Sequence, residues 1–294
     1  MGQHGAVPGA TSRIPAVWLV LLGIASVQLG GAVAKSLFGT ISPTAMVWLR
    51  LLTSALLLLA IARPRLAGRS RHDWLVVLGF GVSLATMNWA IYQSFARIPL
   101  GVAVTIEFIG PLSVALFGSR RPRDVLWAVL AGAGVLLLGV ERTELDLVGV
   151  AYAVFAGAAW ACYILLSADT GRRWPGLDGL AIASVVGAVG LLPFAVAAGG
   201  GTLLETRVLV IGLLVGVLSS VIPYSFELTA LRTLRPATFG ILMSLEPAAA
   251  ALAALVVLQE LLAPVQVLAM ACVVVASIGA TRSGRRTHHE PAPN

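Results

Sequence analysis

The feature that most constrains this chain is a series of apolar segments, each long enough to cross a lipid bilayer. The hydrocarbon core of a bilayer is about 30 Å thick, and a helix of about 20 apolar residues spans it. Lipid offers the backbone no hydrogen-bond partners, so each segment is predicted to be a helix. Ten segments meet this length, at about 17–38, 44–62, 74–96, 100–118, 125–140, 147–167, 178–198, 208–229, 237–257 and 264–281. We therefore predict an all-α integral membrane protein with ten transmembrane helices.

Composition excludes a water-soluble fold of this length. Of the 294 residues, 58% are hydrophobic and 11% are charged, whereas soluble domains carry about 25% charged residues. A soluble chain of this size could not remove so much apolar surface from water. The net charge of +7 does not indicate a nucleic-acid partner, because the arginines occur in short clusters between the apolar segments.

The positions of the arginines predict how the chain is oriented. If the N-terminus is cytoplasmic, 15 arginines fall in the cytoplasmic tails and loops and 3 in the outer loops. Cytoplasmic loops of membrane proteins are enriched in Lys and Arg. We therefore expect residues 1–16 and 282–294 to form tails, both on the cytoplasmic side.

The chain contains an internal repeat. The stretch SFARIPLGVAVTIEFIGPLSVAL at 94–116 aligns without gaps with ALRTLRPATFGILMSLEPAAAAL at 230–252, at an offset of 136 residues. The two repeats, 17–141 and 147–281, would then hold five helices each. Since five is odd, the second repeat enters the membrane inverted. Secondary transporters have this plan, with the substrate site near the midplane between the repeats.

Three charged residues fall deep inside the predicted helices. At 1.5 Å per residue, Glu107 lies about 12 Å from the outer end of the fourth helix and Arg50 about 9 Å from the outer end of the second. Glu246 lies at a similar depth in the ninth helix. A charge at this depth costs at least about 2.5–3.5 kcal/mol and usually faces a cavity or a partner. A substrate cavity would explain them, as would a buried Arg50–Glu107 ion pair that only fixes packing and a structural role for Glu246.

Two further charges lie one turn from a helix end. Lys35 is near the outer end of the first helix and Glu227 near the inner end of the eighth. Lys35 could face the cavity or extend its ammonium to the outer lipid headgroups. We interpret Glu227 as a solvated residue or a partner of Arg232, and not as part of the site.

Uncharged polar residues could complete the lining of a cavity. Asn88 and Tyr92 are four residues apart and share one face of a helix, and Trp160 and Tyr163 are three apart in the sixth helix. Gln28 lies in the first helix. Hydrogen bonds between helices would also explain Gln28 and Asn88, and the tyrosines could belong to an aromatic belt at the membrane surface.

Sequence motifs for catalysis are missing. The chain has no GxxxxGK[ST] loop, no HExxH and no GxSxG, which are the marks of nucleotide binding, zinc hydrolysis and serine hydrolysis. The two cysteines, Cys162 and Cys272, lie in apolar segments with no histidine nearby. We therefore predict no catalytic residue, no metal site and no cofactor, and expect an ion or solute gradient to drive any transport.

Several stretches resemble a known transporter superfamily. They are SVQLGGAVAKSLF at 26–38, GVSLATMNWAIYQSFARIPLGVAVTIEFIGPLSVALFGSRRP at 81–122 and IPYSFELTALRTLRPATFGILMSLEP at 222–247. Each half resembles an EamA domain of the drug/metabolite transporter superfamily, and the whole resembles bacterial inner-membrane exporters of threonine and homoserine. The resemblance implies a multi-pass inner-membrane exporter of small hydrophilic amino acids that exchanges them against protons.

A zwitterionic amino acid needs partners of both charges in such a site. We assign its ammonium to Glu107 and its carboxylate to Arg50, with Lys35 as second choice, since an arginine fork suits a carboxylate. A proton is expected on Glu107 or Glu246, because burial disfavours a charged carboxylate. The polar side chain of the substrate would meet Gln28, Asn88 and Tyr92, and the cavity walls would be Trp160 and Tyr163.

Other functions stay open at this point. An exporter of another metabolite or of an amine drug in the same superfamily would also use buried acids. An intramembrane enzyme acting on lipid and a passive channel are further alternatives. The expected partners are an amino acid, a proton and membrane lipid, and the sequence does not indicate an oligomeric state.

Overall fold

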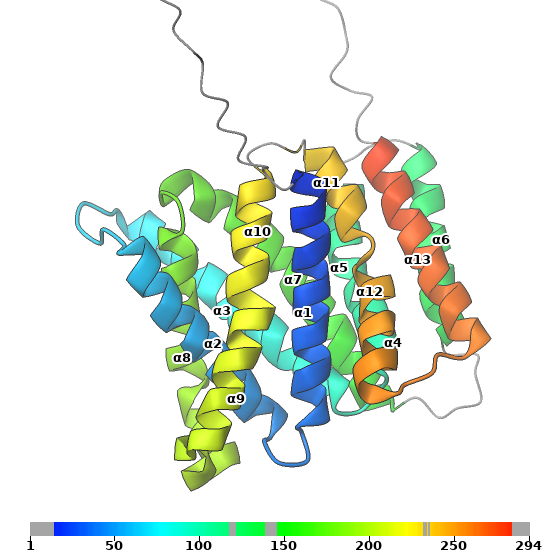
Figure 1. Ribbon diagram of the computed structural model, residues 1–294. Coiled ribbons are helices and arrows are strands. Elements are labelled where there is room, and N and C mark those ends of the chain that lie inside the picture. Colours follow the sequence, from blue (N-terminus) through cyan, green and yellow to red (C-terminus); the bar gives the residue numbers. More distant parts are fainter. Residues whose placement is uncertain (1–14, 118–121, 139–145, 232–233, 235, 284–294) are drawn as a thin grey trace, which may run out of the picture.

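The computed structural model describes residues 15–117, 122–138, 146–231, 234 and 236–283, and this part of the chain contains helices and no strands (Figure 1). The tails predicted at 1–16 and 282–294 fall almost entirely outside it. The first half of the chain forms α1 (Ala16–Ser36), α2 (Pro43–Ala62), α3 (Arg71–Phe95), α4 (Leu100–Glu107), α5 (Ile109–Phe117) and α6 (Pro122–Leu138). The second half forms α7 (Leu147–Arg173), α8 (Asp178–Gly199), the 3-10 helix η1 (Gly200–Leu204), α9 (Thr206–Gly216), the π-helix η2 (Val217–Val221), α10 (Ile222–Leu231), α11 (Pro236–Met243), α12 (Glu246–Ala253), the π-helix η3 (Ala254–Leu258) and α13 (Pro264–Ser283).

All ten predicted segments are mainly helical where the structure describes them. Among the described residues, seven helices are long and apolar enough to cross a membrane: Ala16–Ser36, Pro43–Ala62, Arg71–Phe95, Leu147–Arg173, Asp178–Leu204, Thr206–Glu227 and Phe239–Leu258. Three more are apolar but shorter, at Leu100–Val114, Val125–Leu137 and Pro264–Gly279. The prediction of an all-helical, multi-pass membrane protein is confirmed, and a count of ten crossings stays a prediction.

Local sequence explains where several helices begin. The hydroxyl of Ser42 accepts from the amide of Ala45 at 3.3 Å, and a proline follows at the first helical position of α2, where a missing N–H costs nothing. Asp146 caps α7 by accepting from the amides of Val148 and Gly149, and its carboxylate lies 3.0 Å from the guanidinium of Arg97. The hydrogen bond from Arg97 and those from the amides hold the pKa of Asp146 below its usual range.

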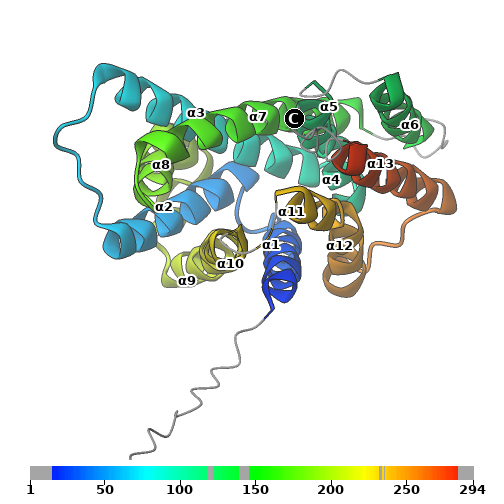
Figure 2. The ribbon, with the colours of Figure 1, turned by 90° about the horizontal axis from the view of Figure 1, so that it is seen from above.

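The two halves of the chain interlock instead of standing apart. Helices of the first half pack mainly on helices of the second: α3 on α7, α2 on α8, α6 on α13, and α1 on α10. Figure 2 shows α1 between α10 and α12 on one side of the bundle and α3 and α7 together on the other. In Figure 1, α1 begins and α13 ends at the same face of the bundle, which we call the inner face; the opposite one is the outer face.

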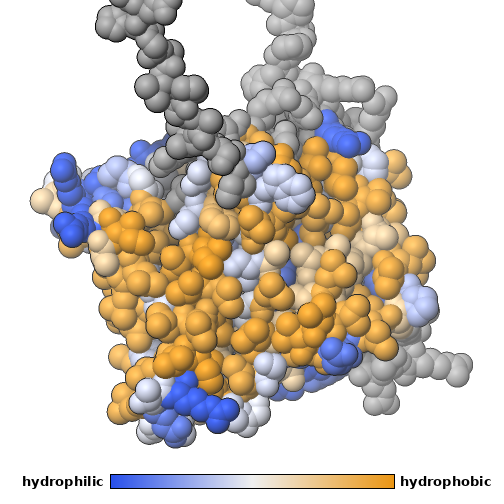
Figure 3. Space-filling model, viewed as in Figure 1, coloured by the Kyte–Doolittle hydropathy of each residue, from blue (hydrophilic) through white to orange (hydrophobic). Residues whose placement is uncertain are grey.

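The outside of the bundle is apolar around its middle. Figure 3 shows hydrophobic side chains in a wide band, with hydrophilic residues gathered toward the inner and outer faces. Large apolar side chains such as Leu56, Val82 and Leu136 are exposed in this protein, at 61%, 59% and 75%. In a soluble protein such a continuous band would be a liability, so it is the surface that meets lipid.

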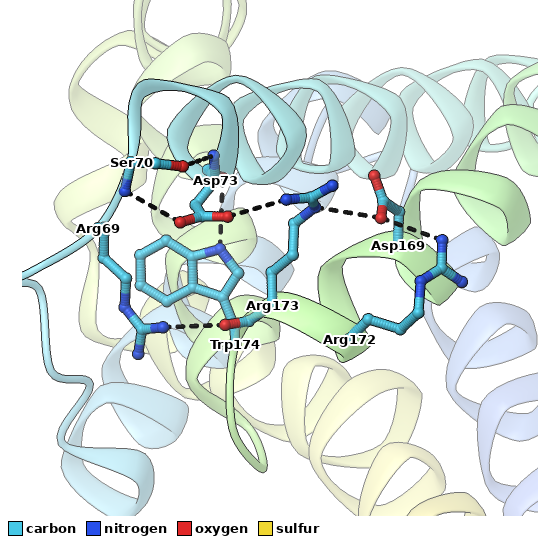
Figure 4. Close-up of polar contacts among 7 residues, drawn as sticks. All are labelled: Arg69, Ser70, Asp73, Asp169, Arg172, Arg173 and Trp174. Carbon is cyan, nitrogen blue, oxygen red and sulfur yellow. Dashed lines mark hydrogen bonds and ion pairs between the residues drawn. The ribbon is translucent and has the colours of Figure 1, made fainter.

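A polar cluster at the inner face joins α3 to the end of α7 (Figure 4). Arg173 donates to Asp73 and to Asp169, both at 3.1 Å. Arg69 donates to the carbonyl of Arg173 at 2.9 Å and lies 4.4 Å over the ring of Trp174. The indole N–H of Trp174 donates to the carbonyl of Asp73 at 3.3 Å. These contacts fix the indole of Trp174, which is 2% exposed, in one orientation.

Candidate functional site

Two of the predicted segments are broken in their middle. Segment 100–118 is divided into α4 and α5 at Phe108, and segment 237–257 into α11 and α12 at Ser244 and Leu245. The last residues of α4 and α11, Glu107 and Met243, are 136 residues apart, the same offset as in the sequence repeat. Discontinuous helices at corresponding positions of two repeats mark binding sites in transporters.

A cavity of about 130 Å³ lies beside both breaks. We call it the central cavity. Its walls include Glu107 at the end of α4, Glu246 at the start of α12, and Arg50 from the middle of α2. The exposed fractions of these three residues are 8%, 6% and 7%. The other predicted residues that line it are Gln28, Asn88, Tyr92, Trp160 and Tyr163.

Arg50 is held by neutral groups. Its guanidinium donates to the carbonyl of Ser219 at 2.7 Å, to the hydroxyl of Ser220 at 3.1 Å and to the phenol of Tyr92 at 3.4 Å. No ion pair joins Arg50 to Glu107 in the described part of the chain. A guanidinium has five N–H groups, so two of them have no acceptor among the described residues.

The main-chain partner of Arg50 comes from a π-helix. Ser219 and Ser220 lie in η2, a single π-helical turn between α9 and α10. Such turns shift the backbone hydrogen bonds and occur often at functional sites. Gly30 of α1 packs directly against Ser219, where a Cβ would overlap its hydroxyl. The sequence did not identify these two serines as site residues, because a π-helical turn has no characteristic residue pattern.

The acids of the central cavity form no ion pair in the part of the chain that the structure describes. Neither Glu107 nor Glu246 forms an ion pair within the described residues. Glu246 is the first residue of α12, where the helix dipole favours a negative charge. With Glu227, which also lines it, the cavity thus holds a guanidinium and three carboxylates, and no ion pair joins them among the described residues. A buried charge without a partner is costly, so this arrangement suits a ligand that carries both charges.

Lys35 does not line the central cavity. Its ammonium lies 2.6 Å from the carboxylate of Glu260 and donates to the carbonyl of Ile98 at 2.8 Å. Glu260 also accepts from the amide of Leu100 at 2.9 Å. These contacts tie the outer end of α1 to the start of α4 and to the connection between η3 and α13. The second-choice role given to Lys35, binding the substrate carboxylate, does not fit this position, because Glu260 already pairs with its charge.

On the inner side, a second cavity of about 530 Å³ adjoins the first. We call it the inner vestibule. It reaches the last turn of α7 and the connection to α8, where Gly171 and Gly176 are exposed. The residues that line both cavities are Trp160, Tyr163, Tyr224, Glu227 and Met243.

Tyr224 and Glu227 were not assigned to the site from sequence, although the repeat offset could have found them. Tyr224 follows Asn88 by 136 residues, and both line the central cavity. The further lining pairs at this offset are Val27 and Tyr163, Met87 and Pro223, Ile91 and Glu227, and Glu107 and Met243. Five pairs of residues at the repeat offset of 136 therefore line one cavity.

Comparison with known proteins agrees with this arrangement. The profile of the EamA-like transporter family matches residues 147–282. Threonine/homoserine exporters RhtA of Salmonella typhimurium and of Escherichia coli are each 41% identical to this chain over 287 residues, covering 95% of it and 97% of the relative.

A solved crystal structure superposes with a TM-score of 0.63 at 19% sequence identity, covering 92% of this chain and 99% of the other. That likeness shows the fold alone. The relatives match over nearly their whole length, and so the chain belongs to the EamA-like transporter family, in the group of RhtA.

Proposed function

We propose that this transporter exports small zwitterionic amino acids of the threonine and homoserine type, with the substrate's ammonium at Glu107 and its carboxylate at Arg50. The observation that carries the proposal is that these two opposite charges line one small cavity without pairing. The two remaining N–H groups of Arg50 could take a carboxylate in a bidentate hydrogen bond. The relatives named as threonine/homoserine exporters support this substrate class.

The size and the walls of the central cavity support a small hydrophilic substrate. Its volume of about 130 Å³ is well below the roughly 300–1,000 Å³ of sites for drug-sized ligands. The amide of Asn88 donates to the carbonyl of Leu84, which leaves its oxygen as an acceptor for a substrate hydroxyl. Trp160 is held edge-on by Phe108, and Tyr163 is held against Phe80. Gln28 and Tyr92 complete the polar wall.

We propose a topology of ten membrane crossings in two inverted repeats, 17–141 and 147–281, in the bacterial inner membrane. The matched helix breaks and the lining pairs at offset 136 support it. The inner face would be cytoplasmic, because α1 begins and α13 ends there and the basic end of α7, with Arg172 and Arg173, lies on that side, as the enrichment of cytoplasmic segments in arginine predicts.

Exchange against protons is the proposed energy source. Once the substrate's ammonium leaves Glu107, the carboxylate stays in a buried site without a basic partner, which is costly at this depth. A proton would neutralise the carboxylate in place of the ammonium. Glu107 and Glu246 are the candidate proton carriers, because both line the central cavity.

Glu107→Gln is expected to reduce threonine transport at least about tenfold. The amide keeps the shape of the side chain but loses a charge-assisted hydrogen bond worth about 1.5–3 kcal/mol to the substrate's ammonium. The measurement is uptake of radiolabelled threonine and homoserine into everted membrane vesicles under a pH gradient. Glu205→Gln is the control, because Glu205 is exposed at the start of α9. Wild-type uptake by the Glu107 variant would remove this residue from the mechanism.

The contact between Lys35 and Glu260 is expected to act as the outer closure of the transport cycle. Lys35→Glu should lower uptake about three- to tenfold, because repulsion replaces an ion pair of partly exposed groups worth about 1 kcal/mol. Adding Glu260→Lys should restore only part of the uptake, since this second change removes the acceptor of the Leu100 amide. The same assay in vesicles checks this, and a double variant no better than the single one would contradict it.

A further inference from the structure

The inner vestibule differs from the central cavity in size and in chemistry. Its volume of about 530 Å³ is about four times that of the central cavity. Much of its wall is aromatic, with rings from four helices and from the α7–α8 connection, among them Phe80, Trp160, Trp174 and Phe239. The inner-face cluster of Figure 4 holds the ring of Trp174 in place. The vestibule is therefore a preformed apolar space and not a gap between loose loops.

Its charge comes from one side chain. Glu227 is the charged residue in the described lining of the vestibule, and no Lys or Arg lines it there. Arg50 lines the central cavity instead. Within the described lining of the vestibule, a molecule thus meets a carboxylate and no guanidinium.

Glu227 lies where the two cavities join. It lines both, together with Tyr163 and Tyr224. Among the described residues no cation pairs with Glu227. Arg232, the partner considered from sequence, lies outside the described part of the chain.

We propose that Glu227 and the aromatic walls around it form a second binding site, which takes a primary ammonium group from the cytoplasmic side before the substrate enters the central cavity. A carboxylate flanked by aromatic faces is suited to an organic cation, because the rings add cation–π attraction. The inference rests on the proposed function, since it places this entry site on the path of an exported amino acid.

The lack of a basic side chain in its described lining gives the second site a ligand class of its own. Amines with a bulky aromatic group fit a vestibule of about 530 Å³, a size typical of sites for drug-sized molecules. They carry no carboxylate, and so they cannot pair with Arg50 in the central cavity. Such amines should therefore occupy the entry site without being carried further, and compete there with threonine.

The test uses everted vesicles, whose exposed face leads to the vestibule, and phenylethylamine as the probe. In wild type, phenylethylamine is expected to inhibit threonine uptake competitively and not to accumulate itself. In Glu227→Gln, we expect the KM for threonine to rise at least fivefold with Vmax within twofold of wild type, and the inhibition constant of phenylethylamine to rise at least tenfold. Glu227→Asp, which keeps the charge, should restore most of the inhibition, and Glu205→Gln should behave as wild type.

The outcomes separate this inference from the proposed function. If wild-type vesicles do not take up threonine or homoserine, the proposed function fails. If they do, and Glu227→Gln keeps the wild-type KM and inhibition constant, or phenylethylamine accumulates, the entry site is overturned. Should Glu227→Gln not reach the membrane, Tyr224→Phe removes a neighbouring hydroxyl and provides the second variant. Weaker inhibition by phenylethylamine in that variant, with Vmax kept, supports the site, and unchanged inhibition contradicts it.

Discussion

Arg50→Lys is expected to lower Vmax/KM for threonine transport at least about 100-fold, although the positive charge is kept. The guanidinium reaches three acceptors at once, the carbonyl of Ser219 and the hydroxyls of Ser220 and Tyr92. A lysine ammonium is a compact point charge that cannot hold this fork and still meet a carboxylate in a bidentate manner. Hydrogen bonds of charged groups are worth about 1.5–3 kcal/mol each, and two lost bonds correspond to at least about 100-fold.

Kinetics in everted vesicles, normalised to the amount of transporter in the membrane, check this prediction. Arg97→Lys is the matched control, because Arg97 pairs with Asp146 at the outer surface with 43% of its side chain exposed. That variant should keep its transport within about twofold, since exposed ion pairs contribute about 0–1 kcal/mol. Uptake by Arg50→Lys equal to wild type would mean that the substrate brings no carboxylate to Arg50, and would favour an exporter of organic cations.

The depth of charged residues in the apolar segments was the strongest signal in the sequence. Insertion cost alone singled out Arg50, Glu107 and Glu246, and the structure brings all three to one cavity. It also separates Arg50 from Glu107 by giving the guanidinium neutral partners, so the alternative of a direct structural ion pair does not describe this conformation. The depth of a residue within a membrane-spanning helix can be predicted from sequence, because a helix rises by a fixed length per residue.

Contacts between residues that are distant in sequence could not be predicted in the same way. Lys35 and Glu260 are 225 residues apart, and nothing near Lys35 in the sequence shows that α1 and the η3–α13 connection meet. Two other features also depend on how the two halves pack together, and so they could not be predicted from local sequence. They are the contact of the Ser219 carbonyl with Arg50 and the position of Glu227 in the cavity wall. The repeat offset helps to predict such residues. Tyr224 lies 136 residues after Asn88, and so it becomes a candidate for the cavity lining once Asn88 is assigned there.

Gly110→Ala is expected to destabilise the folded transporter by about 3 kcal/mol or more. Gly110 lies in the first turn of α5, just after the break that follows Glu107. A Cβ there would overlap the carbonyl of Gly157 in α7, and a Cβ on Gly157 would lie 2.7 Å from the carbonyl of Glu107. Overpacking typically costs about 1–3 kcal/mol when side chains can adjust. Here the obstacle is backbone, which no rotamer change can move.

Gly132→Ala is the matched control, because it makes the same chemical change in a helix where nothing lies within 4 Å of the added carbon. Alanine is a better helix former than glycine by up to about 1 kcal/mol, so this variant should be as stable as wild type or slightly more so. Thermal unfolding of the detergent-purified proteins, followed by size-exclusion chromatography, measures the difference. If both variants unfold at the wild-type temperature, α7 does not cross the broken helix as closely as the structure has it. A selective loss in Gly110→Ala would tie the position of Glu107 to this crossing, since the same contact of α7 with α4 and α5 holds the carboxylate at the central cavity.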